Sequence, residues 1–329
     1  MANPNYPGQN QGAGDVRALN LDLFSGEIIG AFETATVFRD KHQSKTLAKG
    51  KSFRFPAIWR AGGGYHTPGT ELLGRRINHT EILVTPDDKL VSDVFLPDIE
   101  EIINHFDVRQ PYMKEMGEFL ARHYDANVLR TILLASRGGA LFTGDQGGGA
   151  VVNASLATDG NALIDAISAA KQSMDEKDVP VNSMPVYAAF RPAQWYLMAR
   201  TDRNLNRNTN GSDGEVSYKS MKLTTIDDIQ VLKTNIANDV YLTDNRAAPY
   251  STAGNEKFIP TNYRGSFGAT VGTVWTPMAA CSALVEDVKF QIEDQPRKQG
   301  TLMIAALTVG TRTLRSKCAV ELRTGAIPA

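Results

Sequence analysis

Residues 50–85 constrain the fold more than any other segment, because they combine strand-forming sequence with little to pack against. The run "KSFRFPAIW" alternates apolar and polar residues, a glycine-rich and proline-rich stretch follows, and "INHTEILVT" supplies a second extended run. Together they predict a long two-stranded ribbon. A ribbon of two strands is only marginally stable alone in water, so it requires a partner surface. We expect that surface to be contacted by the apolar residues Phe53, Phe55, Trp59 and Tyr65.

The ribbon begins with Gly50-Lys51-Ser52, a tripeptide that also ends phosphate-binding loops. Such a loop needs a further glycine five residues earlier, and its Gly-Lys-Ser must open a helix. Lys45 occupies the earlier position, and the residues after Ser52 have a strand pattern. The sequence therefore predicts a turn followed by a strand, without a nucleotide site.

Composition narrows the classes of function. The 329 residues are 42% hydrophobic and 22% charged, which allows a substantial core, and the net charge is −1. This balance argues against a dedicated sequence-reading nucleic-acid binder, which usually carries a basic excess, but not against a protein that encloses nucleic acid. The two cysteines, Cys281 and Cys318, lack metal-ligand spacing and are expected to be reduced thiols. The sequence has no secretory signal pattern at its start and no apolar run of about 18 residues, so we expect no membrane span.

A long helix is predicted over residues 111–137. Pro111 suits a first helical turn, and Gly138-Gly139 suits an end. At 1.5 Å per residue, such a helix is about 39 Å long. Its apolar residues recur at steps of three or four: Met113, Met116, Leu120, Tyr124, Val128, Ile132 and Ala135.

The remainder of the chain alternates helix and strand patterns, which suits a sheet flanked by helices. A short helix is predicted after Ser25, and a polar loop over residues 201–215. Further helices are predicted over residues 159–179, capped by Asp159, and 191–200, with Pro192 near the start. Strands are predicted over residues 184–190, 228–237, 290–292 and 302–309.

Motifs for chemistry are missing from the sequence. The five histidines are not spaced as metal ligands, and there is no G-x-S-x-G elbow, so we predict no catalytic, cofactor-binding or metal-binding residues. The ribbon carries four arginines: Arg54, Arg60, Arg75 and Arg76. They either lie solvated or pair with an acidic face of another copy, for which the candidates are Asp98, Glu100 and Glu101. Those carboxylates also suit the start of a predicted helix.

Three stretches carry a family resemblance: "FSGEIIGAFETATVF", "GKSFRFPAIWRAGGGYHTPGTELLGRRINHTEILVT" and "SDVFLPDIEEIINHFDVRQPYMKEMGEFLARHYDANVL". In this order they resemble the major capsid protein of T-seven-like podophages. The resemblance is close over roughly residues 20–135, weaker over 140–280, and loose again over 270–325. It implies an α+β chain with the Johnson fold of tailed-phage capsid proteins.

The resemblance also implies a domain organisation. Residues 1–48 correspond to the N-terminal arm and 49–85 to the extended E-loop. Residues 86–140 and 283–329 correspond to the P-domain with its long spine helix, and 141–282 to the A-domain.

The implied function is structural rather than enzymatic, and no cofactor is implied. Hexamers and pentamers of the chain would tile an icosahedral shell around the double-stranded DNA of a tailed phage, without reading its sequence. The implied partners are further copies, a scaffolding protein during assembly and a portal at one vertex, with no membrane. The implied location is the virion, and the host cytoplasm during assembly. The alternatives are an encapsulin-type nanocompartment shell and a soluble enzyme using the middle α/β region.

Overall fold

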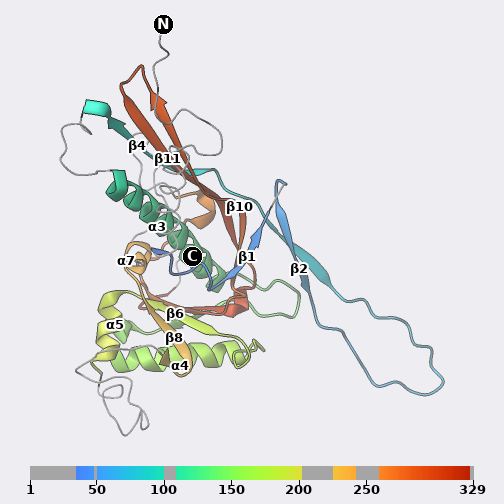
Figure 1. The fold of residues 1–329 in the computed structure, drawn as a ribbon. Coiled ribbons are helices and arrows are strands. Elements are labelled where there is room, and N and C mark those ends of the chain that lie inside the picture. Colours follow the sequence, from blue (N-terminus) through green and yellow to red (C-terminus); the bar gives the residue numbers. More distant parts are fainter. Residues whose placement is uncertain (1–34, 48–49, 100–108, 202–224, 242–258, 327–329) are drawn as a thin grey trace. The chain divides into compact units, whose positions relative to one another are not determined.

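The computed structural model describes residues 35–47, 50–99, 109–201, 225–241 and 259–326 (Figure 1). The chain divides into two compact units, and each is treated by itself. The first takes its described residues from 1–37, 87–125 and 284–309, and the second from 38–86, 126–283 and 310–329. The short helix predicted after Ser25 and most of the polar loop predicted over 201–215 lie outside the described residues.

The first unit contains most of three strands of one sheet, in which β11 (Gly300–Thr313) lies between β10 (Ala280–Gln295) and β4 (Leu90–Pro97). Strands β11 and β4 are antiparallel, and their register runs from Leu307 opposite Leu90 to Gly300 opposite Pro97. The strand runs predicted around residues 290–292 and 302–309 are confirmed, as parts of longer strands.

The long predicted helix is confirmed as α3 (Arg109–Ser136). All seven apolar residues of the three-and-four pattern, from Met113 to Ala135, are at most 4% exposed. This regular spacing places them on one face of the helix, and their burial provides the packing that stabilises it. The helix ends just before Gly138, whose backbone N–H donates to the carbonyl oxygen of Ala135 at 3.0 Å.

The second unit contains a six-stranded sheet in the order β5-β12-β9-β6-β8-β7. The strands β6 and β8 are parallel, as are β5 and β12, while β9 runs antiparallel to both of its neighbours. Every residue of β9 and β12 is buried, so this sheet is the centre of the unit. Its strands are β5 (Gly149–Val152), β6 (Val186–Phe190), β7 (Thr225–Ile226), β8 (Ile229–Lys233), β9 (Thr270–Trp275) and β12 (Ala319–Arg323).

Two helices of this unit follow the predicted signals. Helix α4 (Gly160–Asp175) begins where Asp159 accepts a hydrogen bond from the Asn161 N–H at 2.9 Å, and it packs against β12 and β5. Helix α5 (Pro192–Ala199) has its proline in the first turn. The predicted strand at 184–190 corresponds to β6. The predicted strand at 228–237 corresponds to β8 only as far as Lys233, because Ile236 and Ala237 begin helix α7. The smaller elements of the unit are β1 (Gln43–Thr46), η1 (Ala154–Ala157), α7 (Ile236–Tyr241), η2 (Thr261–Tyr263) and η3 (Ser316–Cys318).

A buried charge cluster stabilises the centre of the second unit. Glu321 on β12 is 0% exposed and accepts two hydrogen bonds from the Arg137 guanidinium, at 2.8 and 2.7 Å. Arg323 donates to the same carboxylate at 3.4 Å, and the Thr270 hydroxyl donates to it as well. A buried carboxylate is tolerated only when its oxygens are paired in this way.

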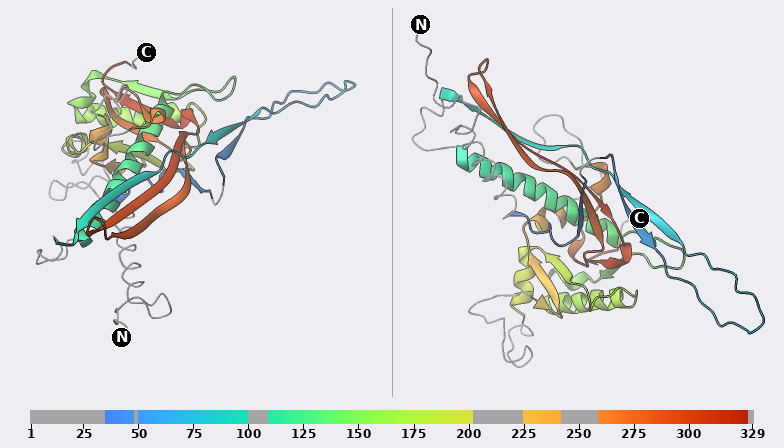
Figure 2. Two further views of the ribbon diagram at one scale, coloured as in Figure 1. Left: turned by 90° about the horizontal axis from the view of Figure 1, so that it is seen from above. Right: turned by 45° about the vertical axis from the view of Figure 1, so that its right-hand side comes forward.

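The predicted ribbon is confirmed where its two strands pair with each other. Strands β2 (Phe53–Ile58) and β3 (His79–Val84) form a two-stranded antiparallel sheet, with Phe53 opposite Val84 and Ile58 opposite His79. The residues after Ser52 thus form a strand and not a helix. This agrees with the prediction that Gly50-Lys51-Ser52 precedes a strand and is not a phosphate-binding loop. We call residues 53–59 with 78–84 the root, and residues 60–77 the tip segment. The tip segment contains no strand and extends away from the root (Figures 1 and 2).

The two units and the four predicted domains share some boundaries. The boundaries predicted near residues 86 and 283 fall within one residue of unit boundaries. Residues 126–140 and 310–329 differ, because they group with the unit that contains 141–282 and not with the first unit. The assignment of arm, E-loop, P-domain and A-domain remains a prediction.

Candidate assembly interface

The root of the ribbon is packed into its own subunit. Its inward-facing side chains join a cluster that contains Phe55, Ile82 and Val84 from the ribbon, with Cys281, Ala283 and Leu314 from elsewhere in the second unit. Phe55 is 6% exposed and Val84 is 0% exposed. Strand alternation explains this arrangement, since Phe53, Phe55 and Ala57 lie on one face of β2.

This packing corrects the expectation for Phe55. The sequence suggested that its ring contacts another copy, but the ring fills the core of its own subunit. Phe53 is half-buried against the same cluster, with its ring centroid 4.7 Å from that of Phe55 in an edge-on arrangement. Phe55 is therefore removed from the candidate interface.

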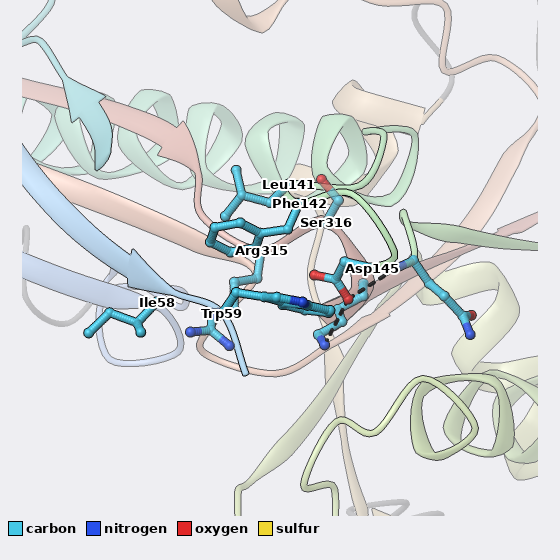
Figure 3. Close-up of a pocket in the computed structure, with 9 residues that line it drawn as sticks. Ile58, Trp59, Leu141, Phe142, Asp145, Arg315 and Ser316 are labelled. Carbon is cyan, nitrogen blue, oxygen red and sulfur yellow. Dashed lines mark hydrogen bonds and ion pairs between the residues drawn. The ribbon is translucent and has the colours of Figure 1, made fainter. Parts of the chain in front are cut away.

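Trp59 continues the inward-facing row just beyond β2 and meets a second cluster (Figure 3). Its ring stacks on Phe142, with centroids 5.3 Å apart and an interplanar angle of 29°. The Lys317 ammonium lies 5.7 Å from the centroid of the Trp59 ring. A stacked aromatic pair contributes about 1 kcal/mol beyond burial, and a cation over a ring about as much. Trp59 is thus docked on its own subunit and is half-buried there, and its contact with another copy stays a prediction.

A buried ion pair supports this second cluster. Lys317 Nζ donates to Asp145 Oδ1 at 3.0 Å, and the two side chains are 10% and 11% exposed. The backbone N–H of Asp145 donates to the carbonyl oxygen of Phe142 at 3.0 Å, which ties the carboxylate and the ring to one turn. Lys317 lies in η3, directly before β12, so the ion pair ties the turn that carries Phe142 to the start of a central strand, and Trp59 contacts both Phe142 and Lys317.

The tip segment has the opposite character, because all of its residues are exposed. The large apolar side chains of the tip are largely uncovered: Tyr65, Leu72 and Leu73 at 110%, 77% and 79% exposure, with Ile77 at 44%. The outer face of the root adds Ile58 at 66% and Leu83 at 42%. So many large apolar side chains exposed along one projection are typical of a protein contact surface.

The predicted proline-glycine tip forms a tight turn at Thr67–Thr70. The Thr70 N–H donates to the carbonyl oxygen of Thr67 at 3.2 Å, and Gly69 has a φ of +93°. Proline at the second position and a positive φ at the third are the features of a type II turn, which favours glycine there.

The candidate arginines have different partners. Arg54 pairs with Glu81 across the outer face of the root at 2.7 Å, and Arg75 donates to the carbonyl oxygen of Gly63 at 2.8 Å, within the tip. Arg60 contacts Asp178 at 2.9 Å, with side chains 62% and 68% exposed. Such exposed pairs are worth about 0–1 kcal/mol. The tip segment contains three arginines and one glutamate, so it carries a positive charge.

The acidic candidates belong to the first unit or lie outside the described residues. Asp98 is exposed and directly follows β4. Glu100 and Glu101 are outside the described residues. The sequence analysis missed two apolar residues of β4, Val91 and Phe95, which are 42% and 37% exposed. The sequence "LVSDVFLP" does not alternate apolar and polar residues, so periodicity gave no signal that could have separated this open face from the other one.

Burial shifts the pKa values of the two cysteine thiols of the second unit. Desolvation raises the pKa of the Cys281 thiol to about 12 and also raises the pKa of Cys318. Both cysteines are free thiols, as expected. Within the described part of the chain, no cluster of side chains is arranged to bind a metal ion, and no helix has the length and hydropathy needed to cross a bilayer.

Comparison with known families identifies the family of this chain. A sequence model of the family described as "Gp10A-like: Major capsid protein" matches residues 54–323, which include the ribbon, α3 and the central sheet. The chain belongs to this family.

Two curated relatives of this capsid protein come from podophages. The major capsid protein of Escherichia phage T7 is 41% identical over 132 residues, which are 38% of this chain and 38% of that protein. The major capsid protein of Enterobacteria phage T3 is 41% identical over 124 residues, which are 37% and 36% of the two chains. These matches span little more than a third of the curated relatives. They confirm the resemblance to T-seven-like major capsid proteins.

Solved capsid structures share the fold of this capsid protein. The capsid structure of the cyanophage P-SCSP1u matches with a TM-score of 0.75 at 29% identity, over 88% of each chain. The mature capsid of bacteriophage PhiM1 matches with a TM-score of 0.67 at 13% identity, over 89% of this chain and 88% of that one. The predicted α+β Johnson fold is thus confirmed. Family and fold are those of structural capsid proteins rather than enzymes, and the family match does not favour the encapsulin alternative.

Proposed function

We propose that this chain assembles as hexamers and pentamers into an icosahedral shell that encloses double-stranded phage DNA. The observation that carries the proposal is the division of the ribbon. Its root is buried in its own subunit, while residues 60–77 are exposed and present apolar side chains. An exposed two-armed segment gains order only when a surface covers it, and in a shell an adjacent copy supplies that surface.

The interface would combine apolar and charged contacts. On the ribbon we assign Tyr65, Leu72 and Leu73 as apolar contacts, with Arg60 and Arg76 as charges. The acidic side chains at residues 98–101 of another copy remain the proposed partners, and the open face of β4 lies directly before them. Individual contacts of this kind are weak, so a closed lattice with many of them allows errors to dissociate during assembly.

The remaining partners follow from the family and are proposals of the same kind. A scaffolding protein would guide assembly in the host cytoplasm, and a portal would occupy one vertex of the virion shell. The net charge of −1 suits enclosure of DNA without sequence-specific recognition. The N-terminal arm, E-loop, P-domain and A-domain keep the boundaries given above as proposed assignments.

A shortened ribbon tests the proposal directly. Replacing residues 61–76 with Asn-Gly leaves Arg60 and Ile77 flanking a two-residue hairpin turn in the register set by Ile58 and His79. We expect this variant to fold, as judged by circular dichroism, but to form no closed shells in electron micrographs. The control is the unchanged chain, expressed with a scaffolding protein and examined for nuclease-protected DNA after packaging. Normal shells from the shortened variant would contradict the assigned role of the tip.

A further inference from the structure

The direction of the ribbon is determined where strand pairing ends. The Trp59 N–H donates to the carbonyl oxygen of Asn78 at 2.9 Å, one residue beyond the last register pair of β2 and β3. The next residues in the tip segment are exposed and form no strand. Along the first strand of the ribbon, Trp59 is therefore the last residue that is fixed both by backbone pairing and by side-chain packing.

Trp59 packs against residues from two other parts of the same unit. Phe142 stacks on its ring, and Lys317, paired with Asp145, lies over the ring (Figure 3). The neighbouring contact of Arg60 with Asp178 is mostly exposed to solvent, so salt screens it. Trp59 thus dominates the attachment at this point.

We propose that Trp59 is a positioning residue, whose stack on Phe142 fixes the direction in which the tip segment leaves the subunit. This inference rests on the proposed function, because the direction matters only if the tip contacts an adjacent copy. The sequence analysis assigned Trp59 to that contact itself, whereas the structure assigns it to the attachment of the ribbon.

The length of the segment makes the direction important. Residues 60–68 span at most about 30 Å when fully extended. A rotation of about 10° at the root then moves the far end by about 5 Å, which exceeds the roughly 4 Å within which apolar side chains contact each other. Loss of the stack would leave the tip chemically intact but misplaced relative to its partner surface.

Distance measurements between spin labels test this inference in the unassembled full-length subunit. One label replaces Leu72 at the tip and the other replaces Ala169, which is exposed on α4 of the same unit. The native cysteines are buried with raised thiol pKa values, so the labels react at the introduced cysteines. We expect Trp59→Ala to broaden the distance distribution at least twofold and Trp59→Phe to preserve it. Phe142→Ala should broaden the distribution to the same extent, because it removes the ring on which Trp59 stacks.

Tyr65→Ala is the matched control, because it removes an aromatic side chain from the tip without touching the root. It should leave the distance distribution unchanged. In assembly, Trp59→Ala should reduce the yield of closed shells at least tenfold, and Trp59→Phe should restore it to within twofold of the unchanged chain. A Trp59→Ala distribution as narrow as that of the unchanged chain overturns the inference, as does a Trp59→Phe distribution as broad as that of Trp59→Ala. Failure of the unchanged chain to form shells would instead refute the proposed function and leave the distance result standing.

Discussion

Phe55→Ala distinguishes the role of the root from that of the tip segment. It removes a ring from the root that the sequence alone would assign to an interface. Phe55 is 6% exposed, packs with Ile82 and Val84, and makes an edge-on contact with Phe53. Removing a buried phenylalanine costs about 4 kcal/mol, which combines lost burial, lost aromatic contact and a residual cavity. For a chain of 329 residues, this corresponds to a decrease in melting temperature of about 6 °C.

The assay is thermal unfolding of the unassembled subunit, followed by circular dichroism. Ile58→Ala is the matched control, since Ile58 lies on the same strand, on the opposite face, and is 66% exposed. Its effect on the free energy of unfolding should stay within about 1 kcal/mol. Equal decreases for the two variants would refute the conclusion that the inner face of the root is part of the subunit core.

Three further predictions concern the second unit and α3. Lys317→Met should lower the free energy of unfolding by about 3 kcal/mol in chemical denaturation, since it leaves the Asp145 carboxylate buried and unpaired, and Asp145→Asn in the same chain should recover much of the loss. Burial lowers the pKa of His42 from 6.5 to about 4, although the nearby Asp40 carboxylate acts in the opposite direction. Between pH 6.5 and pH 4, the imidazole is therefore protonated in the unfolded state but neutral in the folded state. Stability should therefore decrease as pH falls from 6.5 to 4, by about 3 kcal/mol, and His42→Gln should remove this part of the pH dependence. Leu120→Asp, at 0% exposure on α3, should abolish folding as measured by circular dichroism.

Local signals were sufficient to predict the long helices and the ribbon strands, but not β9 and β12, the fully buried strands at the centre of the second unit. The three-and-four spacing from Met113 to Ala135 predicted α3, and the side chain of Asp159 caps α4 as expected. These features depend on residues close in sequence, so a helix period or a cap identifies them without knowledge of the rest of the chain.

The surroundings of the ribbon could not be predicted in the same way. Alternation along β2 shows that the strand has two faces, but not which surface covers each face. The partners of Phe55 include Cys281 and Leu314, which lie more than two hundred residues further along the chain. Likewise, the pairing of Asp145 with Lys317 joins residues separated by 172 positions, and neither residue belongs to a recognisable motif.

The full exposure of residues 60–77 has a consequence for genetics. These side chains contribute little to the folding of the subunit. Substitutions there should therefore yield well-folded protein whose defects appear only when many copies interact. Second-site suppressors of such changes are then expected on a different molecule from the one carrying the original lesion.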